Sequence, residues 1–242
     1  MKHYLQHALK GLREKMKDKK KLLGTLLPSY AVVPLLILIF SNLIVYYGAR
    51  VINFALNRTY YDMAGNIDRM LPVVPSFVIL YVAAFPFWYI TYYLICRSNP
   101  DNCYATVVAS VTAKLLCGVL FIMFPATIVR PELTGAGLSD KLLGFIYSVD
   151  AADNLFPSIH CLESWLCFLF IKDEVKVPRP VKLMSMLLAI GICLSTLFTK
   201  QHVFADVVSG VLIAYGAYAF RIRLLAEAPK YHARRKSLKP VA

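Results

Sequence analysis

Long apolar stretches alternate with short polar segments along the chain, a pattern that predicts helices crossing a membrane. Such a helix needs about 20 mostly apolar residues to cross a hydrocarbon core of about 30 Å. Six stretches fit, of which the fourth is short: 27–47, 72–96, 103–125, 157–171, 181–199 and 203–220. We therefore expect an all-α integral membrane bundle of six transmembrane helices, forming a single domain over residues 1–242.

The distribution of charge predicts how this bundle is oriented. The formal net charge is +13, and Lys and Arg concentrate in segment 1–26, in the loop after the fourth stretch and in the tail 221–242. Because basic loops remain on the cytoplasmic side, both termini and that loop are predicted to be cytoplasmic. The segments 49–71 and 127–155 and the turn at 200–202 then face the extracytoplasmic side.

The amino-acid composition further narrows the class of protein. The chain is 58% hydrophobic and 17% charged, with a mean hydropathy of +0.58, so the lipid bilayer is its main surrounding. The basic residues are not interleaved with aromatic ones, which argues against nucleic acid as a partner. The six cysteines form no C-x-x-C pair, so neither a disulfide framework nor a zinc site is indicated. Oligomeric state has no signal in the sequence.

The segment before the first stretch has a helical pattern of its own. Leu5, Leu9, Leu12 and Met16 recur at helical spacing among basic residues. This spacing predicts an amphipathic basic helix on an anionic membrane surface. A solvated basic tail fits the same residues equally well.

His202 and Asp206 form the most informative polar pair on the outer side. Four residues apart, they share one face of a helix, so the carboxylate can hold one ring nitrogen and leave the other free as a nucleophile. A buried structural pair between helices is the alternative. We assign His202 as the candidate nucleophile and Asp206 as the residue that orients it.

A second cluster, at residues 156–160, is predicted to bind an anion and to supply a proton. Pro157 suits the first position of a helix, so Ser158 and nearby backbone N–H groups would present the positive end of the helix dipole to a phosphate. His160 can then protonate a departing alkoxide. A simple helix cap beside an interfacial histidine remains the alternative.

Two further basic residues and one acidic residue lie within or beside the apolar stretches. Arg130 offers a planar fork of donors that matches two phosphate oxygens; extension of its side chain to the membrane interface is the alternative. Lys114 falls near the middle of the third stretch, where a charge is costly, so we expect it to face a partner or a cavity. Glu163 lies one turn beyond His160 and is expected to stabilise its charged form. For both, a structural hydrogen bond is an alternative.

The order Arg-Pro, Pro-Ser-x-His, His-x3-Asp, spanning Arg130 to Asp206, resembles the type 2 phosphatidic acid phosphatase superfamily with its motifs K-x6-R-P, P-S-G-H and S-R-x5-H-x3-D. Met123, Ile159 and Thr196 stand where the superfamily has lysine, glycine and arginine. This reduced set is similar to a divergent branch that includes inositol phosphorylceramide and sphingomyelin synthases. Lys200 is then a candidate to supply part of the lost positive charge.

The resemblance implies an enzyme without a metal or other cofactor that acts on a membrane lipid phosphate. His202 would attack phosphorus, His160 would protonate the leaving alcohol, and Arg130, Ser158 and Lys200 would hold the phosphate oxygens. Hydrolysis of a phosphatidic acid-type lipid phosphate or of a polyprenyl diphosphate, on the extracytoplasmic side of the plasma membrane, is the leading expectation. Transfer of the headgroup to an alcohol such as inositol and non-catalytic lipid binding or transport are the alternatives.

Overall fold

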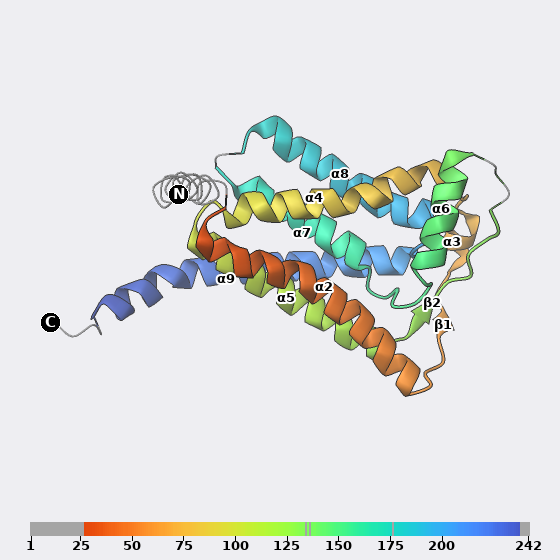
Figure 1. The fold of residues 1–242 in the computed structure, drawn as a ribbon, viewed down its shortest axis with the longest axis horizontal. Coiled ribbons are helices and arrows are strands. Elements are labelled where there is room, and N and C mark those ends of the chain that lie inside the picture. The colour runs from red at the N-terminus through yellow and green to blue at the C-terminus, as the bar shows by residue number, and fades with distance from the viewer. Residues whose placement is uncertain (1–26, 134, 136, 176, 238–242) are drawn as a thin grey trace, which may run out of the picture.

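Six helices of 15 residues or more run alternately up and down the bundle in the computed structural model, which describes residues 27–133, 135, 137–175 and 177–237 (Figure 1). They are α2 (Ser29–Ala55), α4 (Val78–Cys96), α5 (Pro100–Met123), α7 (Ile159–Asp173), α8 (Arg179–Phe198) and α9 (Phe204–Ser237). The all-α architecture predicted from the sequence is confirmed for these residues.

Helix α7 lies at the centre and contacts α4, α5, α8 and α9, while α2 packs mainly on α5. The core side chains of α7, among them Leu162, Leu166 and Phe170, are fully buried. By contrast, many apolar side chains of the surrounding helices point outward; Ile44 of α2 is 69% exposed. An apolar outer surface over a buried centre is what a bilayer favours.

Five helices are long and apolar enough to cross a membrane: α2, η1 with α4 (Pro75–Cys96), α5, α8 and α9 up to Pro229. The fourth stretch became α7, whose 15 residues span about 22 Å, less than the hydrocarbon core of about 30 Å. Five candidate crossings are thus found among the described residues, and the sixth stays a prediction.

The remaining short elements gather at the end of the bundle where α8 turns into α9 (Figure 1). They are β1 (Tyr61–Asp62), α3 (Asn66–Met70), η1 (Pro75–Phe77), β2 (Ala126–Thr127) and α6 (Leu138–Val149). Strands β1 and β2 pair in parallel, with Tyr61 opposite Ala126.

Two segments differ from the structure expected from the sequence, and a third lies outside the residues that the structure describes. The predicted loop 127–155 contains helix α6, because its hydrophobic residues follow a helical period over a stretch too short to look like a membrane crossing. Helix α9 continues without a break to Ser237, through most of the predicted tail. The predicted amphipathic helix within 1–26 lies outside the described residues.

Candidate active site

His202 lies in the tight turn between α8 and α9, with Asp206 in the first turn of α9. Its Nδ1 is 3.2 Å from Asp206 Oδ2 and 3.1 Å from the carbonyl oxygen of Leu155. Because both neighbours accept hydrogen bonds, Nδ1 carries the proton and Nε2 is left with a free lone pair. The same Asp206 oxygen accepts from the backbone N–H of Val203 at 2.9 Å, which fixes the carboxylate.

The protonation of His202 reflects a competition between burial and Asp206. Burial lowers the pKa of the imidazole, but the hydrogen bond and the negative charge of Asp206 outweigh it, and the pKa is raised above its usual value. Since His202 is 9% exposed, this carboxylate acts on it with little solvent screening.

Ser158 is the N-cap of α7, and its hydroxyl accepts from the backbone N–H of Cys161 at 3.3 Å. Pro157 therefore precedes the cap instead of occupying the first helical position predicted for it, because α7 begins at Ile159. The backbone N–H of Ser158 donates to the carbonyl of Asp206 at 3.1 Å. This contact joins the start of α7 directly to the start of α9.

His160 faces His202, with 6.2 Å between the ring centroids. Aromatic rings surround it: Tyr81 stacks on the imidazole at 4.2 Å, and Phe85 and Trp88 meet it edge-on at 5.6 and 5.1 Å. Its Nε2 is buried without a hydrogen-bond partner. The structure thus brings the two predicted histidines together, and His160 Nε2 has no hydrogen-bond partner among the described residues.

Arg130 reaches the same region from the segment after β2. Its guanidinium donates to the carbonyl of Asp150 at 2.6 Å and to the side-chain oxygen of Gln201, and it lies 4.7 Å from the ring centroid of Tyr147. Its Nε is buried without a partner. Through Gln201, the residue before His202, Arg130 is tied to the turn between α8 and α9.

Lys200 is placed differently from the other predicted phosphate ligands. Its ammonium donates to the backbone carbonyls of Asp68 and Leu71, at the end of α3. The Asp68 carboxylate in turn accepts from the backbone N–H of Phe204 at 2.7 Å. Burial lowers the pKa of Lys200, and the charge of Asp68 opposes this only in part. These contacts fasten α3 to both sides of the His202 turn.

Asp150 was not singled out by the sequence as part of this site. Its carboxylate accepts from Tyr46 at 2.6 Å and from Tyr81 at 2.9 Å, while its carbonyl holds Arg130. The signal in the sequence that could have identified Asp150 was its place as an acidic residue shortly before the Pro-Ser-x-His cluster. Tyr81 gave none, because it is one of several tyrosines in its helix and its partner is 69 residues away.

Of three comparisons with known proteins, one returned a match. Residues 125–229, from the start of β2 to the proline in α9, match the family model described as the PAP2 superfamily. The search of curated proteins and the search of solved structures returned no match. The matched segment contains every candidate site residue assigned from the sequence, and it supports the resemblance to this superfamily.

Together, the apolar helices and the superfamily match indicate an integral membrane protein with a lipid phosphatase-type function. The bilayer and a lipid substrate are the corresponding partners. The match extends to the superfamily and carries no information on the divergent branch.

Proposed function

We propose that the protein is a lipid phosphatase that cleaves a lipid phosphate through a phosphohistidine on His202. The observation that supports this most directly is the pair of imidazoles 6.2 Å apart, one held by Asp206 and the other enclosed by aromatic rings. A phosphoryl group with its leaving oxygen can bridge this separation. A structural histidine pair has no need for an unpartnered imidazole nitrogen in the region where Arg130 also has a buried, unpartnered Nε among the described residues.

In the first step the lone pair of His202 Nε2 forms a bond to phosphorus as the bond from phosphorus to the lipid oxygen breaks. The negative charge of the bound phosphate favours the protonated form of His160, which gives its proton to that oxygen, and the lipid leaves as an alcohol. In the second step His160 takes a proton from water, whose oxygen bonds to phosphorus while the P–N bond breaks. Phosphate leaves, and both rings regain their starting protonation.

Arg130 and the start of α7 stabilise the charge on the phosphate oxygens in this scheme. The unpartnered Nε of Arg130 can donate to an oxygen without breaking an existing hydrogen bond. The N–H groups near the Ser158 cap add the positive end of a helix. The Lys200 ammonium, held by two carbonyls, supports the turn and is not assigned to the phosphate.

The test is release of inorganic phosphate from a panel of phosphatidic acids and polyprenyl phosphates in detergent. We expect turnover by the wild type that survives a metal chelator and falls by about 10³-fold or more in His202→Ala. A lipid labelled in its phosphate should leave an acid-labile, alkali-stable label on the wild type only. Tyr218→Phe, which removes one hydrogen bond to Asp173 far from the site, is the matched control.

The same assay separates the two alternatives. Addition of inositol or another alcohol diverts the label into a new phosphodiester or phosphate ester if headgroup transfer is the reaction. No label on His202 and no product with any lipid would identify a binding protein and overturn the proposal.

We further propose that the site faces the extracytoplasmic side and that both termini are cytoplasmic. In support, α2 begins and α9 ends at one end of the bundle, opposite the His202 turn (Figure 1). All six native cysteines are buried, so engineered thiols can be labelled selectively. An impermeant maleimide should label Leu138→Cys, on the site side, in intact cells. Val175→Cys, in the loop after α7, should react only after permeabilisation.

A further inference from the structure

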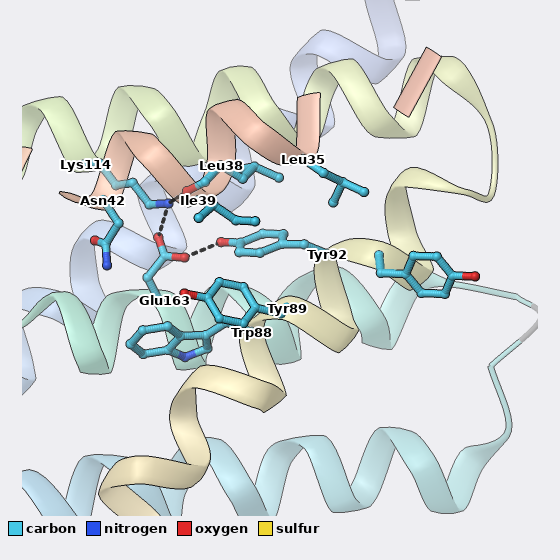
Figure 2. Close-up of a pocket in the computed structure, with 10 residues that line it drawn as sticks. Leu35, Leu38, Ile39, Asn42, Trp88, Tyr89, Tyr92, Lys114 and Glu163 are labelled. Atoms are coloured by element: carbon cyan, nitrogen blue, oxygen red, sulfur yellow. Dashed lines mark hydrogen bonds and ion pairs between the residues drawn. The ribbon is translucent and has the colours of Figure 1, made fainter. Parts of the chain in front are cut away.

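A cavity of about 120 Å³ lies within the apolar part of the bundle, between α2, α4, α5 and α7 (Figure 2). Most of its wall is aliphatic or aromatic: Leu35, Leu38, Ile39, Trp88, Tyr89 and Tyr93. Tyr89 is 46% exposed on the outer, lipid-facing surface of the helices. The cavity is therefore within reach of a molecule that enters sideways from the bilayer.

Two buried charges face this cavity. Lys114 Nζ lies 3.4 Å from Glu163 Oε1, and both residues are 1% exposed. Tyr92 donates to the other Glu163 oxygen at 2.5 Å, as Figure 2 shows. The expectation that Lys114 faces a partner or a cavity is confirmed. Glu163, expected beside His160, instead contacts Lys114 and Tyr92, because its side chain points to α5 and α4.

The polar groups left without a hydrogen bond at this cavity are acceptors. The three N–H bonds of Lys114 are directed to the Leu38 carbonyl at 2.9 Å, to Ser41 and to Glu163. Asn42 Oδ1 is buried and accepts no hydrogen bond from the residues that the structure describes, and Glu163 Oε1 has only the 3.4 Å ion pair with Lys114. An unsatisfied buried acceptor is costly, so such a site favours a ligand that brings O–H or N–H donors.

The cavity is adjacent to the proposed active site. Trp88 lines the cavity, and its ring centroid lies 5.1 Å from that of His160. Glu163 follows His160 by three residues on α7, which places it about 5 Å deeper along the helix. In a lipid phosphate, the groups that join the phosphate to the hydrocarbon chain lie at that depth when phosphorus is at His202.

We propose that this cavity binds a hydroxyl or amide N–H group on the backbone of the lipid substrate, through Asn42 and Glu163. This assignment rests on the proposed phosphatase function and narrows its substrate class. Lipids with a donor a few bonds from the phosphate are preferred over polyprenyl phosphates, whose chain is pure hydrocarbon beyond the phosphate. The buried pair of Lys114 and Glu163 holds the acceptor in place.

The test compares two substrates that differ by one group, 1-oleoyl-glycerol 3-phosphate and its 2-deoxy analogue. We expect the wild type to hydrolyse the hydroxyl-bearing lipid with a kcat/KM about five- to tenfold higher, as one hydrogen bond allows. Asn42→Leu should abolish this preference and leave the 2-deoxy lipid unaffected, because Asn42 Oδ1 makes no hydrogen bond to any residue that the structure describes. Tyr47→Phe, a polar deletion on the outer face of the same helix, is the matched control.

Ile39→Trp, which fills the cavity from α2 and keeps the Asn42 amide, should remove the same preference. Equal kcat/KM for the two lipids in the wild type overturns the cavity assignment and leaves the phosphatase standing. A parallel loss on both lipids in Asn42→Leu shows a structural role and also overturns it. Absence of phosphate release from every lipid overturns the phosphatase and this assignment with it.

Discussion

Tyr81 stacks on His160 with 4.2 Å between the ring centroids, and its hydroxyl donates to Asp150 at 2.9 Å. Asp150 therefore holds the surroundings of the proposed general acid through Tyr81, while its own carbonyl holds Arg130. Asp150 thus links Tyr81, and through it the surroundings of His160, to the distant residue Arg130. The ring contact positions the imidazole, and the hydrogen bond positions the ring.

Tyr81→Phe separates these two contributions, since it keeps the stack and removes the hydroxyl. We expect kcat to fall about three- to tenfold with KM nearly unchanged, the effect of one lost hydrogen bond on positioning. Phosphate release at saturating and limiting lipid measures the two constants. Tyr104→Phe, on the exposed face of α5, is the control. A rise in KM alone would show that Tyr81 binds lipid instead of positioning His160.

Asp206→Asn should shift the pH dependence of turnover to lower pH. The pKa of His202 is raised by Asp206, and nucleophilic attack needs the neutral ring, so activity of the wild type falls as pH drops through that raised value. Without the carboxylate charge the pKa drops, and the acidic limb of the profile moves in the acidic direction. The plateau rate should also fall by about 10²- to 10⁴-fold, because the tautomer is held less firmly.

The measurement is kcat/KM of phosphate release against pH for both proteins. A control for the loss of charge elsewhere is Asp173→Asn, at the other end of the bundle. An acidic limb that stays in place or moves to higher pH would contradict the assignment of this limb to His202.

Hydrophobic patterning was enough to locate six helices of the bundle, because each apolar stretch must bury its backbone in a helix. The candidate site was found because polar residues at the ends of apolar stretches are rare. His202, Asp206, Ser158, His160 and Arg130 all stand at such ends, and the structure gathers them.

Contacts between distant segments were not accessible to the same reasoning. The ends of α6 are set by packing on η1 and α4, and its length is below that of a crossing, so it was read as loop. Lys200 was assigned to the phosphate because it adjoins His202. Its actual partners lie on α3, 129 and 132 residues away in the sequence.

Lys200→Met distinguishes support of the turn from phosphate binding. We expect the variant to lose stability by about 1.5–3 kcal/mol, since two carbonyls lose a charged donor, and turnover to fall because α3 no longer holds the His202 turn. Inhibition by inorganic phosphate should keep its strength. Thermal unfolding in detergent and phosphate inhibition of residual activity measure the two effects.

Asp68→Ala provides the comparison for Lys200, because it removes the cap of Phe204 from the same helix α3 without removing a cation. Similar losses in the two variants support a shared role in positioning. If phosphate inhibition weakens in Lys200→Met and not in Asp68→Ala, the Lys200 ammonium binds the phosphate.

Gly210→Ala should separate the start of helix α7 from the start of helix α9, which together carry the candidate site. A Cβ added at Gly210 would lie 2.5 Å from the carbonyl oxygen of Ser158 and 3.2 Å from the backbone nitrogen of Leu162, and neither backbone atom can move aside alone. Helix α9 must then shift away from the start of α7, which stretches the hydrogen bond from Ser158 to Asp206. We expect a loss of about 1–3 kcal/mol in stability and a larger loss in turnover.

Gly216→Ala is the matched control for this substitution. It lies on the same helix, and nothing is within 4 Å of the added Cβ. Because alanine favours a helix over glycine, this variant should gain about 0.5–1 kcal/mol and keep full activity. The two glycines lie six residues apart on α9, so opposite signs in thermal unfolding would locate the effect at the contact between the helices. Equal behaviour of the two variants would mean that the close approach of α9 to Ser158 does not determine the geometry of the site.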